Sequence, residues 1–155
     1  MKKICCFAGH GKFQYGKDIY SRLSETIEKL IITENVQEFW VGNYGNFDGI
    51  SGTAVRRLKE KYPHIILNLV IPYLTSELNN NKEFYKNKYD NIIVADMPEN
   101  TPKRLKIIKC NEYMVKNSDF LICYIEYSWG GAAKTFEFVK KKTKTKIINL
   151  TKIQG

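Results

Sequence analysis

The sequence predicts an α/β fold, with one domain built on a Rossmann-like, mostly parallel sheet of five to six strands flanked by helices. Short apolar runs bounded by turn residues alternate with longer amphipathic stretches, which is the pattern of a parallel sheet covered by helices. The chain has 155 residues, and they form a single domain, 1–155. This length suffices for one core of ordinary size and requires no second domain.

The expected strands are short and apolar, and the first is apolar throughout, as in a strand that helices cover on both faces. They are 4–8, 39–42, 65–72, 91–95, 120–126 and 146–150. The expected helices, between them, are 17–33, 53–61, 102–116 and 134–142. We interpret "GNYGNFDGISG" (42–52) as a glycine-rich loop. The polar segment 74–91 is expected to be irregular and partly helical, and it is a candidate lid.

Composition narrows the classes of partner. A formal net charge of +9 permits nucleic-acid binding, but no stripe of interleaved aromatic residues supports it, and a lysine-covered helix face explains the charge equally well. We therefore do not expect nucleic acid as a partner. The apolar runs fall far short of the roughly 20 residues of a membrane helix, and the N-terminal stretch lacks the pattern of a signal peptide. We expect a cytoplasmic protein that does not contact a membrane.

The cysteines show no metal-binding pattern. Cys5, Cys6, Cys110 and Cys123 form no CxxC pair, and the chain has only two histidines, so zinc-ligand spacing is missing. We expect buried, reduced thiols, no metal site and no cofactor.

Three glycine-containing loops follow the first, second and fifth expected strands: "AGHGKF", "GNYGNFDG" and "SWGGAAKT". Ligands of such sheets bind outside the carboxyl ends of the strands, at the point where the strand order reverses. The convergence of these three loops is the main functional signal in the sequence.

The first loop nearly reproduces the phosphate-binding loop of nucleoside triphosphatases. Gly11, four further residues, Gly16 and Lys17 fit that pattern, but Asp18 replaces the serine or threonine whose hydroxyl would hold magnesium. We interpret the likeness as accidental.

A Rossmann-type turn explains the same loop better. Gly9 and Gly11 let the backbone approach an anion, Lys12 supplies a cation, and His10 is placed to contact a ligand. The alternative is a plain tight turn, with His10 satisfied by the local backbone.

In the second loop, Gly42 and Asn43 are candidate ligand contacts. Asp48 serves no apolar pattern, so its carboxylate has two possible uses: facing a ribose hydroxyl, or capping the N-terminus of the following helix.

In the third loop, Gly130 and Gly131 precede a helix whose first turn carries Thr135. The N-terminus of such a helix is suited to binding phosphate. Trp129 either stacks on a base or covers the loop. Glu137, about two turns further on, is either a functional carboxylate or an ordinary acid on the surface.

Five segments in this order, "CCFAGH", the glycine loop with "FDG", "YPHIILNLVIPY", "CNEYMVKNSDFLICYIE" and "GGAAKT", resemble the YpsA-like branch of the SLOG superfamily. That superfamily also contains the LOG phosphoribohydrolases and the DNA-processing protein DprA. The resemblance implies a Rossmann-like fold that holds a nucleotide or a nucleotide-derived ligand. The positions that match the family's binding motifs are Gly9, His10, Asp48, Asn111, Gly130, Gly131 and Thr135.

The chain also departs from the family. The family's first loop continues Gly-His-Arg, where Gly11 and Lys12 follow here, and Cys110 replaces an expected arginine. "WGGAAKTFE" only partly matches the P-G-G-x-G-T-x-x-E motif of the LOG enzymes. Hydrolysis of an N-glycosidic bond needs a carboxylate near the anomeric carbon. The catalytic candidates are Glu126, Glu137 and Asp48, and no motif assigns the role to one of them.

These departures favour binding over catalysis. Our first hypothesis is a protein that senses or sequesters a nucleotide-derived small molecule, such as an ADP-ribose-like or cyclic-nucleotide signal. The second is a LOG-like N-glycosidase of nucleoside 5'-monophosphates. Single-stranded DNA binding, as in the DprA relatives, is a weaker third. Lone domains with this sheet often pair through their helices, so we expect a homo-oligomer, a dimer.

Overall fold

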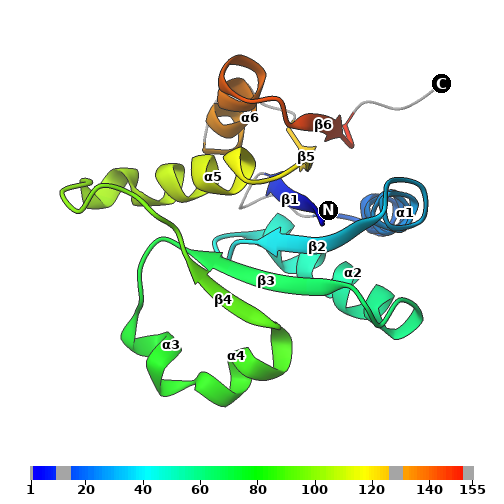
Figure 1. Cartoon of the computed structure of the whole chain (residues 1–155), viewed down its shortest axis with the longest axis horizontal. Helices are drawn as coiled ribbons and strands as arrows, with labels where there is room; N and C mark the ends of the chain where they lie inside the picture. Colours follow the sequence, from blue (N-terminus) through cyan, green and yellow to red (C-terminus); the bar gives the residue numbers. More distant parts are fainter. Residues whose placement is uncertain (1, 10–14, 126–130, 152–155) are drawn as a thin grey trace.

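The computed structural model describes residues 2–9, 15–125 and 131–151. It contains a six-stranded sheet in the order β4-β3-β2-β1-β5-β6 (Figure 1), and every strand pair is parallel. The strands are β1 (Lys3–Gly9), β2 (Val36–Val41), β3 (Ile66–Ile71), β4 (Asn91–Val94), β5 (Phe120–Tyr124) and β6 (Lys146–Asn149). The predicted Rossmann-like fold is confirmed.

Helices cover both faces of this sheet. They are α1 (Lys17–Glu34), α2 (Asn46–Lys61), α3 (Ser76–Asn80), α4 (Lys82–Lys88), α5 (Lys106–Lys116) and α6 (Gly131–Lys142), with a 3₁₀ turn η1 (Lys103–Leu105) before α5. Successive side chains of β1 point to opposite faces of the sheet. Cys5 and Phe7 pack with α1 and α2, whereas Cys6 and Ala8 pack with α5 and α6. Each face therefore has its own apolar core.

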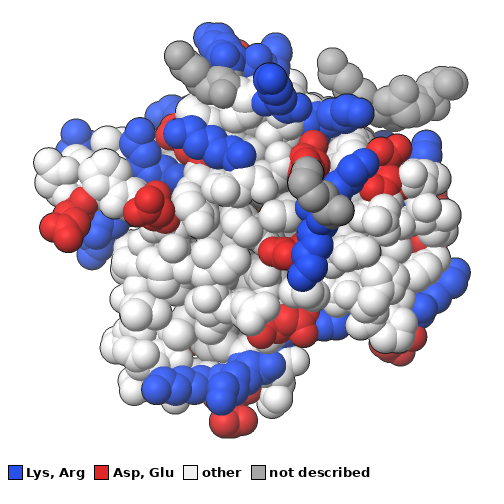
Figure 2. Space-filling model, viewed as in Figure 1, with Lys and Arg blue, Asp and Glu red and all other residues white. Residues whose placement is uncertain are grey.

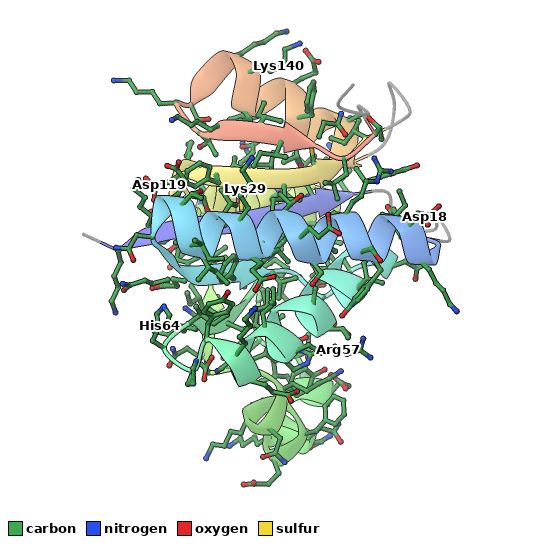
Figure 3. The ribbon with its side chains drawn as sticks, turned by 90° about the vertical axis from the view of Figure 1, so that its right-hand side faces the viewer. Asp18, Lys29, Arg57, His64, Asp119 and Lys140 are labelled. Carbon is green, nitrogen blue, oxygen red and sulfur yellow. The ribbon has the colours of Figure 1, made fainter. Side chains whose placement is uncertain are left out.

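The strand order reverses between β1 and β5. From β1 the chain adds β2, β3 and β4 on one side, then returns to β5 and β6 on the other. Gly9 at the end of β1 is in register with Tyr124 at the end of β5, so the two strands end side by side at the same edge of the sheet. Figure 3 places Asp18, in the first turn of α1, at this carboxyl end and Asp119, just before β5, at the opposite end.

The second glycine loop is shorter than the sequence suggested. α2 begins at Asn46 rather than at Thr53, so Gly49 and Gly52 lie in its first two turns. Phe47 explains the early start, because its side chain is only 1% exposed and belongs to the core shared by β1, α1 and α2. Burying a phenylalanine contributes roughly 1.5–3 kcal/mol, which offsets the helical cost of about 1 kcal/mol for each of the two glycines.

The polar segment after β3 is more regular than expected. It forms α3 and α4, and Leu78 and Tyr85 from these helices pack against Leu69 and Ile71 of β3. The hydroxyl of Thr75 accepts a hydrogen bond from the Leu78 amide and so caps α3. The expected helical content is confirmed, and the role of residues 74–91 as a lid stays a prediction.

All four cysteines are free and buried. Burial raises the pKa of Cys6, Cys110 and Cys123 to about 12, so these thiols stay protonated and serve packing. In the described part of the chain, no helix is long and apolar enough to cross a membrane. The dimer and the cytoplasmic location stay predictions.

Candidate functional site

A cavity of about 660 Å³ opens where β2 ends and α2 begins. Gly42 and Asn43 line it from the turn after β2, Asp48 and Arg56 from α2, and Tyr89 from the segment after α4. Its volume lies within the range of small-molecule sites. The fold therefore brings together three residues that the sequence singled out, namely Gly42, Asn43 and Asp48.

Asp48 closes the turn between β2 and α2. Its Oδ2 accepts a hydrogen bond from the Tyr44 amide at 3.0 Å, and the Gly42 amide also bonds to this carboxylate. A Cβ at position 42 would lie 2.9 Å from Oδ2, so the close approach needs glycine there. The N-cap of α2 is Gly45, and the predicted capping role of Asp48 is therefore wrong. Asp48 lies within the first turn of α2, and its carboxylate reaches back to the Tyr44 amide, which precedes the N-cap residue.

The environment of Asp48 also changes its acidity. Burial raises the pKa of its carboxyl group to about 6, and the hydrogen bonds from the Tyr44 and Gly42 amides oppose this rise. A carboxyl group with this pKa exchanges its proton close to neutral pH, whereas an ordinary aspartate is fully ionised there. The cavity therefore contains a group able to donate or accept a proton.

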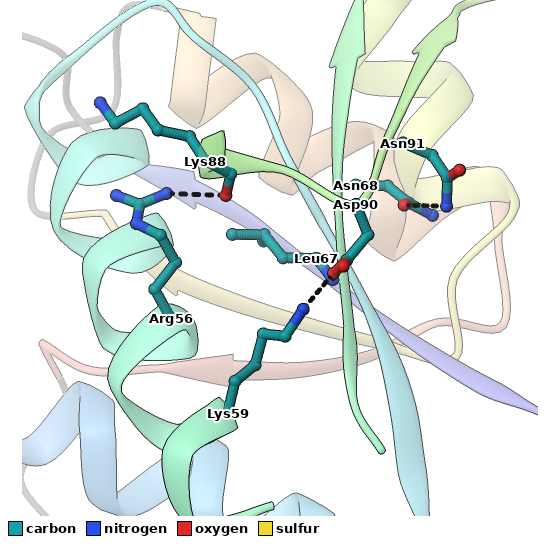
Figure 4. A network of polar contacts seen from close by, with 7 residues as sticks. All are labelled: Arg56, Lys59, Leu67, Asn68, Lys88, Asp90 and Asn91. Atoms are coloured by element: carbon teal, nitrogen blue, oxygen red, sulfur yellow. Dashed lines mark hydrogen bonds and ion pairs between the residues drawn. The ribbon is translucent and has the colours of Figure 1, made fainter. Parts of the chain in front are cut away.

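Arg56 is one of several cavity residues that the sequence did not indicate, and Tyr15 and Tyr89 are others. Its guanidinium lies 5.7 Å from the centre of the Tyr89 ring and 3.4 Å from Oγ1 of Thr53. Figure 4 shows it turned toward the backbone carbonyl of Lys88, at 3.5 Å. A signal existed in the spacing, because Asp48, Gly52 and Arg56 are four residues apart and so share one face of a helix. The expected start of this helix at residue 53 concealed that relation.

Aromatic rings form another part of the wall. Tyr15, just before α1, lines the cavity. Its ring lies 5.3 Å from that of Phe47 and, edge-on, 5.2 Å from that of Tyr124. These contacts hold Tyr15 between the cavity and the ends of β1 and β5. The cavity is therefore adjacent to the point where the strand order reverses.

Other predicted residues lie elsewhere. Gly9 ends β1 beneath Phe47, Asn111 belongs to α5, and Gly131 and Thr135 belong to α6. Thr135 is only 2% exposed. Of the residues that the structure describes fully, Gly9, Asn111 and Thr135 do not line the cavity.

Glu137, one of the catalytic candidates, also lies outside the cavity. Its carboxylate is more than half exposed and lies 3.9 Å from Nζ of Lys140 on the same helix. This is the surface position that the sequence offered as the alternative for Glu137.

Several predicted residues fall outside the described ranges. They are His10, Gly11, Lys12, Glu126, Trp129 and Gly130. Of the three glycine loops, only the second is described in full, so the predictions for the first and third stay predictions.

Lys and Arg side chains gather over α6 in Figure 2, where Lys134, Lys140 and Lys141 are exposed. Within residues 2–9, 15–125 and 131–151, no group of three or more His, Cys, Asp or Glu side chains could hold a metal ion. The described lining of the cavity offers hydrogen-bonding groups, aromatic faces and a guanidinium.

Sequence comparison gives two matches. A profile of the YspA SLOG family matches residues 10–154. The UPF0398 protein BH1768 of Halalkalibacterium halodurans is 28% identical over 118 residues, or 72% of this chain. The match covers 62% of that protein, so the chain spans less than two thirds of its relative's length.

Two solved structures share the fold. The Moco carrier protein of Chlamydomonas rheinhardtii superposes with a TM-score of 0.52 at 15% identity, over 96% of this chain and 76% of that one. DNA processing protein A (DprA) from Streptococcus pneumoniae superposes with a TM-score of 0.53 at 11% identity, over 99% of this chain and 62% of that one. At these identities the likeness shows the fold alone.

Proposed function

Because this chain belongs to the YspA SLOG family, we propose that it binds a nucleotide-derived small molecule at the carboxyl edge of its sheet and senses or sequesters it. One observation carries the proposal. The cavity of about 660 Å³ collects Gly42, Asn43 and Asp48 next to the reversal of strand order, which is where sheets of this kind bind ligands.

The wall of the cavity suits the parts of a nucleotide. Asn43 and Asp48 offer hydrogen-bonding groups to ribose hydroxyls, and Tyr15 and Tyr89 offer rings to a base. An ADP-ribose-like or cyclic-nucleotide signal contains all of these parts. The Moco carrier protein, which by its name carries a small molecule, shares the fold, and it supports the proposal by analogy only.

A second candidate function is N-glycosidic hydrolysis of nucleoside 5'-monophosphates. It is favoured by the pKa of about 6 at Asp48, since a general base works best when its pKa lies near the working pH. The Asp48 carboxylate would activate water for attack at the anomeric carbon.

One experiment separates binding from hydrolysis. Small molecules released by denaturing the purified protein are identified by mass spectrometry, and the folded protein is then incubated with nucleoside monophosphates, ADP-ribose and cyclic nucleotides. Calorimetry measures binding and chromatography measures free base. We expect an intact nucleotide-derived ligand and no release of base. Recovery of no ligand and absence of binding across this panel would contradict the proposal.

The Asp48→Asn variant assigns the role of the carboxylate. For a binding protein, the substitution weakens affinity. For a glycosidase, it abolishes a steady release of base that the wild type shows. Asp96→Asn is the matched control, because Asp96 is exposed and does not line the cavity.

A further inference from the structure

The guanidinium of Arg56 lines the cavity without a carboxylate to balance it. Among the described residues, no Asp or Glu lies within ion-pair distance of this side chain. The guanidinium contacts Thr53 Oγ1 and the Lys88 carbonyl at 3.4 and 3.5 Å, at the long end for hydrogen bonds, and it also donates to the Tyr89 hydroxyl. A guanidinium has five N–H donors, so donors remain for a ligand.

Neighbouring residues restrict the orientation of this guanidinium. Tyr89 stacks against it, and Gly52 lets it lie close along α2, because a Cβ at position 52 would stand 3.2 Å from its Nη1. A planar fork held in one place suits the two-point binding of a phosphate group. Such preorganisation reduces the entropy lost when the ligand binds.

A purely structural role for Arg56 is the competing explanation, since the residue also contacts the end of α4. Another pair already makes that connection. Lys59 of α2 forms an ion pair with Asp90, and Asp90 also accepts a hydrogen bond from the Leu67 amide at 2.7 Å (Figure 4). The segment before β4 is therefore attached to α2 without Arg56.

The two ends of the cavity carry opposite charges. Asp48 and Arg56 are eight residues apart on α2, or about 12 Å along the helix axis. Above its pKa of about 6, the Asp48 carboxylate repels an anion but accepts hydrogen bonds from hydroxyl groups. An anionic group therefore belongs at the Arg56 end and a sugar at the Asp48 end.

We propose that Arg56 binds a phosphate group of the ligand and makes this cavity selective for phosphorylated nucleotides over nucleosides. This inference rests on the proposed function and adds a phosphate site on α2, separate from the glycine loops that follow β1 and β5. The phosphate-binding arginine then lies at a position that no motif in the sequence indicated.

The test compares phosphorylated and neutral probes on two neighbouring arginines. Arg56→Gln is the test variant and Arg57→Gln the matched control, because both remove one positive charge from the same helix. Arg57 is exposed and donates to the Tyr20 hydroxyl at 3.2 Å, on the side of α2 that faces α1 (Figure 3). Calorimetry at fixed ionic strength measures the affinity for the four ribonucleoside 5'-monophosphates, for the matching nucleosides and for pyrophosphate.

We expect Arg56→Gln to weaken binding of the preferred monophosphate about 10- to 100-fold, which corresponds to loss of a charged hydrogen bond, and to leave nucleoside binding unchanged. Arg57→Gln should match the wild type. Arg56→Lys should recover only part of the affinity, because it keeps the charge and loses the fork. Thermal unfolding of each variant checks that the fold is intact.

Three results would overturn the inference. The first is that the two glutamine variants weaken monophosphate binding equally. The second is that Arg56→Gln weakens the binding of nucleosides and of nucleotides alike. The third is that the wild type binds nucleosides more tightly than nucleotides. If the wild type binds pyrophosphate through Arg56 but none of the nucleotides, the phosphate site stands and the proposed function fails. If it binds neither, both fail.

Discussion

Phe47 of α2 packs directly against Gly9, the last residue of β1. A Cβ at position 9 would lie only 2.4 Å from Cγ of Phe47, a distance that no ordinary packing allows. This contact fixes the start of α2 against the end of β1 and thereby sets the turn that forms the cavity wall.

We predict that Gly9→Ala destabilises the fold by about 1–3 kcal/mol, the usual cost of overpacking. Urea denaturation measures the free energy of unfolding. Gly49→Ala is the control, because a Cβ at position 49 meets no atom within 4 Å and alanine suits a helix. Equal stability of the Gly9→Ala variant and the wild type would show that Phe47 does not hold this position.

We predict that Asp48 makes stability fall as pH rises from about 4 to about 6. Its pKa rises from 3.8 to about 6 on folding because of burial, so the native state binds the proton more tightly than the unfolded chain does. The contribution is fully present below the unfolded pKa and is lost as pH passes the folded one, up to about 3 kcal/mol.

Urea denaturation at several pH values measures this dependence in the wild type and in Asp48→Asn. The difference in unfolding free energy between the two proteins should change across this window and stay constant above it. A difference that does not vary with pH would mean that the pKa of Asp48 is ordinary.

We predict that the four cysteines resist thiol reagents in the folded protein. All four are buried, and the pKa of about 12 at Cys6, Cys110 and Cys123 leaves almost no thiolate at pH 8. Labelling with a disulfide reagent should be negligible in the native state and complete in denaturant. Fast labelling of one native thiol would contradict the assignment of these cysteines to packing.

We predict that Tyr85→Ala loosens α3 and α4 from the sheet. Tyr85 is 6% exposed and packs against the end of β3, and these helices have few other apolar contacts, so loss of the ring should favour local opening. Hydrogen exchange over residues 76–88 should become faster, with little change in β1 or β5. Phe84→Ala is the control, because the neighbouring Phe84 is 54% exposed; equal acceleration in both variants would contradict this role.

The strands were predictable because their apolar runs are clear in the sequence. The start of α2 was not, because its first turns contain Gly49 and Gly52, which local propensity assigns to a loop. Burial of Phe47 against the strands overrides that propensity, and such tertiary contacts are not encoded in any short window of sequence.

Part of the site was also predictable from local sequence. Gly42, Asn43 and Asp48 follow a strand and could be expected near a ligand. Arg56 was missed, because its spacing from Asp48 is helical only if α2 begins before Asp48, and because Tyr89 arrives from a distant segment.

The nucleotide site is tested most directly by an amide and guanidinium NMR titration of the full chain with the ligand recovered from the purified protein, or with the tightest-binding nucleotide of the panel. We expect the signals of Gly42, Asn43, Gly45 and Arg56 to shift in a saturable manner. Signals of Ser118 and Thr145, which line a separate cavity beside Asp119, should not shift. Shifts confined to Ser118 and Thr145, or saturable binding that leaves the signals around Gly42 unchanged, would contradict a nucleotide site in this cavity.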